Sequence, residues 1–140
     1  MRLGCDGVVA NLVKVAAVQF EHRADNKQYN LGRVGHFAGR AAAAGARLVV
    51  CPEMCLTGYW HLRRLDAEAL RGLAEPADGP SVSAVRLLAR RLGAGVGAGF
   101  LESADGQLAI VVQPHFSAQH PSLILSRKMI QKRYGGFPPP

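Results

Sequence analysis

One carboxylate, Glu53, stands where an open α/β sheet would place a catalytic group. The residues before it, RLVVC at 47–51, form a short apolar run closed by Pro52, which is typical of a buried strand. Open α/β sheets bind ligands beyond the carboxyl ends of their strands, and apolar surroundings raise the pKa of a carboxyl group toward the range of a general base. Glu53 is therefore a candidate acid–base group, and the alternative is a solvated glutamate after a turn.

Lys128 is the second candidate, at the end of the segment SLILSRK (122–128). An ammonium group at the end of a strand can reach the same rim as Glu53 and stabilise a developing oxyanion. The alternative is a hydrated lysine, because Lys128 lies in a basic cluster that also contains Arg127, Lys132 and Arg133.

The other chemically interesting residues favour simpler readings. Cys51 and Cys55 flank Pro52 and the histidines are scattered, so we predict buried free thiols and no metal site. The run GAGVGAG (93–99) does not join a strand to a helix, and it predicts a strand packed closely against another layer instead of a nucleotide loop. Tyr59 is a candidate for lining a substrate pocket, with a surface-anchoring aromatic as the alternative.

The elements that would position these groups begin with a βαβ unit. The apolar run at 12–20 predicts a strand buried on both faces, and 47–51 predicts a second strand. Between them, apolar residues at helical spacing predict a helix from Lys27 to about Ala44, capped by Asn26 and ended by Gly45.

Further along the chain, turn residues and periodicity separate five more elements. We predict helices at 66–73 and from 80 or 81 to 93, and strands at 94–101, 107–113 and 122–126. The first two of these strands are expected to form a hairpin across residues 103–106.

Length and composition limit the class of protein. A chain of 140 residues that is 49% hydrophobic and 19% charged is one globular domain. The net charge of +7 comes without interleaved aromatics or a nucleic-acid motif, which argues against nucleic-acid binding. No apolar run is long enough for a membrane span, and three cysteines without a secretory segment predict a cytoplasmic protein.

Several blocks together resemble the nitrilase superfamily of carbon–nitrogen hydrolases. They are VKVAAVQF (13–20), AAGARLVV (43–50) after a helix led by Asn30, CPEMCLTGY (51–59), AGFLE (98–102) and SRKMI (126–130). The matched region runs over residues 10–134, with an irregular tail at 135–140. The resemblance implies an α/β fold, the N-terminal part of a four-layer α-β-β-α sandwich.

The resemblance also implies roles for named residues. Glu53 would be the general base, Lys128 would stabilise the tetrahedral intermediate, and Glu102 would be a supporting acid. Together with a nucleophilic cysteine they would cleave the non-peptide C–N bond of a small amide, carbamoyl compound or nitrile, with no metal or organic cofactor. The full-length protein is expected to be a homo-oligomer.

Two departures from the family pattern shape these expectations. Ala109 and Ile110 replace the usual Tyr-Asn pair that follows the acid at 102. The nucleophilic cysteine belongs to a later motif, whereas Cys5, Cys51 and Cys55 all precede Lys128. We therefore expect domain 1–140 to be incomplete at its C-terminus and inactive alone. We also expect it to expose apolar faces of its strands. The competing hypotheses are a non-catalytic α/β interaction module and a basic anion binder.

Overall fold

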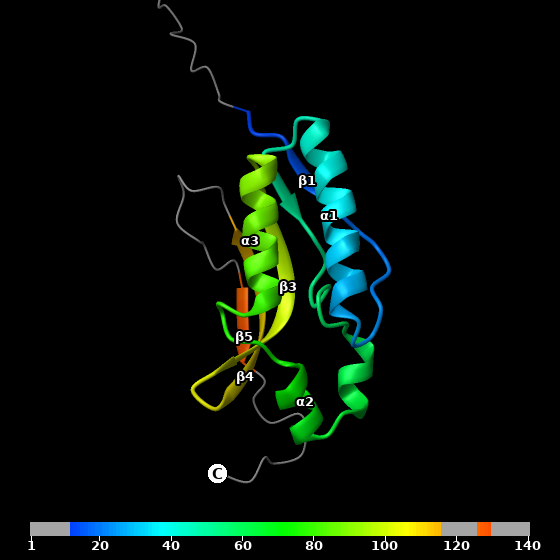
Figure 1. Cartoon of the computed structure of the whole chain (residues 1–140), viewed down its shortest axis with the longest axis vertical. Helices are drawn as coiled ribbons and strands as arrows, with labels where there is room; N and C mark the ends of the chain where they lie inside the picture. The colour runs from blue at the N-terminus through cyan, green and yellow to red at the C-terminus, as the bar shows by residue number, and fades with distance from the viewer. Residues whose placement is uncertain (1–11, 116–125, 130–140) are drawn as a thin grey trace, which may run out of the picture.

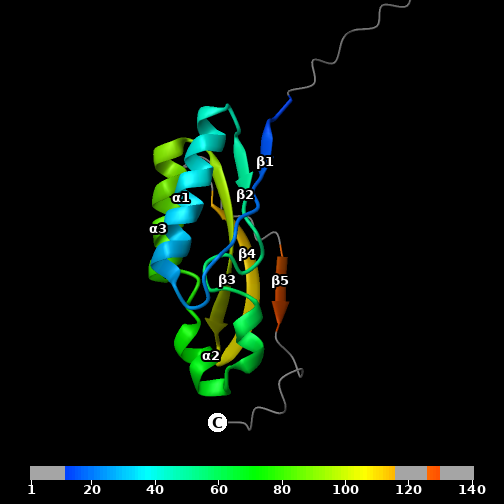
Figure 2. The same cartoon turned by 90° about the vertical axis from the view of Figure 1, so that its right-hand side faces the viewer.

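The protein forms a five-stranded mixed sheet with two long helices on one of its faces (Figures 1 and 2). The computed structural model describes residues 12–115 and 126–129, with side chains up to residue 111. The strands lie in the order β1-β2-β3-β4-β5. Their bounds are β1 Val15–Ala17, β2 Leu48–Val50, β3 Gly95–Ala104, β4 Gln107–His115 and β5 Ser126–Met129. The helices are α1 Lys27–Ala43, the 3₁₀ helix η1 Trp60–Arg64, α2 Ala67–Leu73 and α3 Pro80–Leu92.

The predicted βαβ unit is present as β1, α1 and β2. The two strands are parallel, and β2 is in turn parallel to β3. Asn26 caps α1 by accepting a hydrogen bond from the backbone N–H of Tyr29 (3.0 Å). At the other end Gly45 has a φ of 88° and donates to the carbonyl of Ala42 (2.9 Å). This left-handed residue ends the helix as the sequence predicted.

The shorter elements also begin and end at the predicted signals. Asp66 caps α2 through the N–H of Ala69 (2.8 Å), and α3 carries Pro80 in its first turn. Gly93 follows α3 with a φ of 60°. None of the helices among the described residues is long and apolar enough to cross a membrane.

The predicted hairpin joins β3 to β4. The strands are antiparallel, and Ala104 pairs with Gln107 across a two-residue turn. Asp105 and Gly106 both have positive φ values, 51° and 74°, which is the conformation of a type I′ turn. The register between Val96–His115 and Ala104–Gln107 runs without a bulge, so side chains alternate regularly along β3.

This alternation divides the core into two clusters. Phe100 packs with the helix-covered cluster, whereas its neighbour Leu101 faces a second cluster on the other side of β3. The first cluster joins the sheet to both helices and includes Val34, Ala38, Val49, Val85, Ala89, Val96 and Ala98. The second lies beneath η1 and α2 and includes Met54, Leu62, Leu70, Leu73 and Leu108.

Two predicted strands differ from those observed. The run at 12–20 forms only the three-residue β1, and it is not buried on both faces, since Val15 is 55% exposed. The reason is its place at the edge of a sheet whose helices cover a single face (Figure 2). The last strand, predicted at 122–126, is observed at Ser126–Met129; residues 122–125 lie outside the described residues. Lys128 therefore lies within β5, one residue before its end.

Candidate functional site

Glu53 lies on a short loop, Cys51–Leu56, which leaves β2 and runs beside β3. The N–H of Cys51 donates to the carbonyl of Gly97 (2.8 Å), and the N–H of Leu56 donates to the carbonyl of Gly99 (3.0 Å). Between these two anchors the chain turns at Met54, whose φ is 56°. We call residues 51–56 the Glu53 loop; it is held at both ends by one strand, beyond the carboxyl end of β2 as the sequence predicted.

Gly99 lets the Glu53 loop lie directly on β3. A Cβ atom at this position would collide with the backbone N of Met54 and would lie 3.0 Å from both the Cα and the carbonyl carbon of Glu53. Backbone atoms cannot move aside as the end of a long side chain can. The glycine-rich run predicted close packing against another layer, but the neighbour that needs Gly99 is this loop.

The surroundings of Glu53 differ from the apolar environment predicted for it. Its side chain is exposed, while Cys51, Met54, Cys55 and Leu56 around it are all buried. The loop directs its apolar side chains into the two core clusters and leaves the carboxylate at the surface. Sequence reasoning placed Glu53 correctly after the strand, and the exposed side chain matches the solvated alternative and not the apolar environment. A single apolar run does not show which layers cover its end.

Asn30 connects the Glu53 loop to α1. This fully buried side chain donates to the carbonyl of Leu56 (3.0 Å). It also exchanges two hydrogen bonds with the backbone of Arg23, each 2.8 Å long. Because all these partners are backbone groups, Asn30 fixes the end of the loop against the start of the helix.

The sheet register relates Lys128 and Glu102 to this loop. Lys128 pairs with Ile110, which pairs with Leu101, so Lys128 lies two strands away from β3, about 10 Å in the hydrogen-bonding direction. Glu102 is 6% exposed and shares the helix-covered face of β3 with Phe100. The backbone of the Glu53 loop covers the opposite face at Gly99. Glu102 therefore lies three residues from that contact but on the other face of the strand.

Tyr59 follows the Glu53 loop and is partly buried against the second core cluster. Its N–H donates a hydrogen bond to Nε2 of His22 (3.2 Å). Its ring packs edge-on against Trp60 at a centroid distance of 5.3 Å, and Trp60 is 71% exposed. The structure thus places an aromatic pair next to the Glu53 loop.

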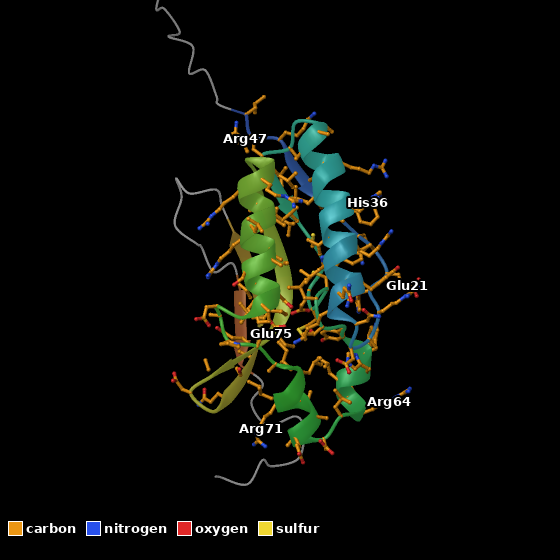
Figure 3. All side chains as sticks on the ribbon, viewed as in Figure 1. Glu21, His36, Arg47, Arg64, Arg71 and Glu75 are labelled. Atoms are coloured by element: carbon orange, nitrogen blue, oxygen red, sulfur yellow. The ribbon has the colours of Figure 1, made fainter. Side chains whose placement is uncertain are left out.

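Glu75 is a buried charged residue that sequence reasoning missed. Its carboxylate binds Nζ of Lys27 at 2.7 Å and accepts hydrogen bonds from the N–H (2.9 Å) and the hydroxyl (2.8 Å) of Ser81. It lies between the N-terminal ends of α1 and α3 (Figure 3). Burial raises the pKa of Glu75, but the hydrogen bonds from Lys27 and Ser81 outweigh it and hold this pKa below its usual value. Only Ser81, directly after Pro80 in the first turn of α3, could have signalled this contact.

The backbone of Glu75 also touches the strand that carries Glu102. Its N–H donates to the carbonyl of Leu101 (3.0 Å), and its carbonyl accepts from the N–H of Ser103 (2.9 Å). These two bonds form a parallel bridge opposite Glu102. Glu75 therefore ties α1, α3 and β3 together at the point where the buried acid Glu102 lies.

Cys51 and Cys55 are both buried and free, as predicted. Hydrogen bonding between the two thiols lowers the pKa of Cys51 despite its burial, and it raises the pKa of Cys55 well above the usual value. Within residues 12–115 and 126–129, no three histidine, cysteine or acidic side chains gather where they could hold a metal ion.

One family model covers most of the chain. The family model described as carbon–nitrogen hydrolase matches residues 14–133. A Mycobacterium tuberculosis hydrolase is 45% identical over 82 residues, which are 56% of this chain and 26% of that protein. A Pseudomonas protegens hydrolase encoded in the pqqF 5′ region is 36% identical over 102 residues, 72% of this chain and 34% of its own length. The chain therefore spans about a quarter to a third of these relatives.

Solved structures share the fold at low sequence identity. XC1258 of Xanthomonas campestris, described as a protein of the CN-hydrolase superfamily, matches with a TM-score of 0.65 at 22% identity, over 80% of this chain and 39% of its own. An amidase from Nesterenkonia sp. matches with a TM-score of 0.60 at 22% identity, over 82% of this chain and 41% of its own. The sheet and helices described above thus share part of that α/β fold.

Proposed function

Since this chain belongs to the carbon–nitrogen hydrolase family, we propose that it carries the general base and the oxyanion-stabilising lysine of an enzyme that cleaves non-peptide C–N bonds. The substrate would be a small amide, carbamoyl compound or nitrile. The observation that carries this proposal is the exposed carboxylate of Glu53 on a loop whose two ends are hydrogen-bonded to β3. A fixed backbone with an accessible carboxylate is what proton transfer to a bound substrate requires.

In the proposed reaction, a cysteine thiol outside these 140 residues is the nucleophile. Glu53 takes the thiol proton as the sulfur attacks the substrate carbon, and it passes that proton to the departing ammonia or amine. Glu53 then takes a proton from water as the water hydrolyses the thioester, which releases the acid and restores the thiol. Cys51 and Cys55 do not suit this role, because both are packed in the core, where the carbon of an amide or nitrile substrate cannot approach their sulfurs.

Lys128 and Glu102 have different parts in this proposal. Lys128 lies in the same row of the sheet as Leu101 and would stabilise the oxyanion of the tetrahedral intermediate. Glu102, on the helix-covered face of β3, would act as a supporting acid that positions the strand rather than as a group that touches the substrate. Tyr59 would line the pocket beside the Glu53 loop.

The remaining parts of the proposal concern the whole protein. Two free buried thiols favour a reducing compartment, so we place the enzyme in the cytoplasm. The exposed apolar residues of the β1 region are consistent with a homo-oligomer of the full-length enzyme. Neither metal nor organic cofactor has a part in the proposed steps.

The test measures ammonia release from a panel of small amides, carbamoyl compounds and nitriles. Two polypeptides are compared, namely residues 1–140 and the product of the same reading frame continued past codon 140. We expect turnover only from the longer polypeptide, since loss of the nucleophile alone costs ~10⁶ in the turnover of a triad enzyme. Glu53→Gln in the longer polypeptide should lower kcat by about 10²–10⁴ with little change in KM.

The matched control is Glu21→Gln, an exposed glutamate in the segment before α1, which should leave kcat unchanged. Turnover by residues 1–140 that Glu53→Gln abolishes would contradict the need for a distant thiol. A continued reading frame without a cysteine, or a longer polypeptide indifferent to Glu53→Gln, would contradict the proposed catalysis and favour a non-catalytic interaction module.

A further inference from the structure

The Glu53 loop leaves β2 and is hydrogen-bonded to β3 at both of its ends, which brings its two cysteines together. The loop is anchored on β3 at the carbonyls of Gly97 and Gly99, two residues apart. Two residues of strand span about 7 Å, so the two points where the loop is bonded to β3 lie about that far apart. Cys51 is the residue at the first anchor, and Cys55 immediately precedes the second, at Leu56. The hydrogen bonding between the two thiols places their sulfurs next to each other, as the formation of a disulfide requires.

The side chains of both cysteines face the same side of the loop. Cys51 and Cys55 are 4% and 0% exposed, and both belong to the core cluster on the helix-covered face. The Cys55 thiol donates to the carbonyl of Gly99 at 3.8 Å, which directs its sulfur toward the neck of the loop. The turn between them is already closed by a hydrogen bond from the N–H of Cys55 to the carbonyl of Pro52 (3.3 Å). The two thiols therefore share one buried environment at the neck of the loop.

We propose that Cys51 and Cys55 form a reversible redox site, in which a peroxide converts the two thiols into a disulfide across the neck of the Glu53 loop. In the first step the sulfur of one cysteine attacks a peroxide oxygen, the O–O bond breaks, and a sulfenic acid and water are formed with hydrogen peroxide. In the second step the other thiol attacks that sulfur and releases a second water. The two thiols lose two electrons and two protons in total, and the peroxide is reduced to water.

The two cysteines differ in the pKa of their thiols and in their exposure, and these differences indicate which cysteine acts in each step. Hydrogen bonding between the thiols lowers the pKa of Cys51, which favours its thiolate, the form that reacts with peroxide. The same interaction and burial raise the pKa of Cys55. Cys51 also has the larger exposed fraction. It is therefore the peroxide-reactive cysteine, and Cys55 resolves the sulfenic acid.

A disulfide at this position would tether the loop from which Glu53 projects. Its effect on turnover rests on the proposed function, but its formation does not, because the thiols and the strand are described without reference to catalysis. A buried thiol pair that is only structural would stay reduced under the same oxidant. The oxidation state of the two thiols after treatment with oxidant therefore distinguishes a redox site from a structural thiol pair, without any assay of turnover.

Peptide mapping tests the proposal on residues 1–140. Trypsin cleavage after Arg47 and Arg63 leaves both cysteines in one peptide, 48–63, whereas Cys5 falls in a different one. The reduced protein is treated with hydrogen peroxide or, separately, with diamide, then denatured, alkylated with N-ethylmaleimide and digested. We expect peptide 48–63 to lose two hydrogens and to take up no maleimide, and dithiothreitol given before alkylation should restore two maleimides.

Single substitutions provide the controls. Cys51→Ser and Cys55→Ser should each abolish the dehydrogenated peptide, and Cys51→Ser should also slow the loss of titratable thiol by at least about tenfold relative to Cys55→Ser, because only the thiolate is nucleophilic. Cys5→Ser should leave the dehydrogenated peptide unchanged. Two maleimides on peptide 48–63 after oxidant, a disulfide to Cys5, or Cys51 that proceeds to sulfinic acid would each overturn the proposal.

Discussion

Gly99 decides how closely the candidate general base approaches the sheet. Because Gly99 has no side chain, the backbone of Glu53 and Met54 can lie where a Cβ atom would otherwise be. The buried amide of Asn30 then holds the other end of the loop through the carbonyl of Leu56. The position of one carboxylate thus depends on residues that never touch a substrate, and each of them can be tested by itself.

Gly99→Ala should destabilise the protein by about 1–3 kcal/mol, because a methyl group placed against backbone atoms forces the loop or the strand to shift. The measurement is the free energy of unfolding in urea. The matched control is Gly39→Ala in α1, where a Cβ would meet nothing within 4 Å and alanine should stabilise the helix by up to about 1 kcal/mol. A Gly99→Ala protein as stable as the parent would show that the loop is not packed as described.

At the scale of elements, Glu75 joins three of them through one carboxylate and its backbone. Lys27 begins α1, Ser81 lies in the first turn of α3, and the backbone of Glu75 bridges β3. The side chain of Glu75 is 9% exposed and that of Lys27 is 26% exposed, so the ion pair is only partly screened by water. Three hydrogen bonds to a charged, mostly buried group make this junction sensitive to pH.

Glu75→Gln should lower the free energy of unfolding at pH 7 by about 2 kcal/mol, since hydrogen bonds to charged groups are replaced by weaker ones. The pKa of Glu75 is depressed in the folded protein, so its contribution to stability is present above the ordinary value of 4.5 and is lost as the pH falls through the lower folded value.

Urea unfolding at a series of pH values should therefore show the difference between Glu75→Gln and the parent shrinking below pH 4.5. Glu21→Gln, at an exposed glutamate, serves as the control and should change the stability little at any pH. A difference that persists unchanged at acidic pH would mean that the carboxylate charge of Glu75 is not what stabilises the junction.

Considered as a whole, the described part of the molecule has one covered face and one open edge. The helices α1 and α3 cover one side of the sheet, while Leu12, Val13 and Val15 at its β1 edge are 95%, 61% and 55% exposed. These are two of the four layers expected for the family sandwich. Apolar side chains at a sheet edge promote association with other chains.

We expect residues 1–140 to self-associate and to bind a hydrophobic dye. The double substitution Val13→Lys and Val15→Lys should raise the fraction of monomer several-fold. Charged residues at an edge strand oppose pairing with another edge. Sedimentation velocity over a range of concentrations measures the effect. Leu87→Lys on α3, where the leucine is 57% exposed, is the matched control and should have little effect. A monomeric parent with a sharp, cooperative thermal transition would contradict the expectation.

Local signals predicted most of the elements. Asn26 and Gly45 mark the ends of α1, Pro80 and Gly93 mark those of α3, and Asp105-Gly106 closes the hairpin. Each of these residues acts through its own backbone conformation or a hydrogen bond a few residues away, so its effect can be read from the sequence. The place of Glu53 after β2 followed from the same local reasoning.

Contacts between segments that are distant in the sequence could not be predicted from such local signals. The exposure of Glu53, the buried junction at Glu75 and the placement of Glu102 on the helix-covered face of β3 depend on which layers lie together. The sequence by itself determined the elements and the order of the candidate residues, because helix caps, turns and alternation are short-range. Only the tertiary structure decided burial, charge pairing and the meeting of Gly99 with the Glu53 loop, because these arise between residues more than forty positions apart.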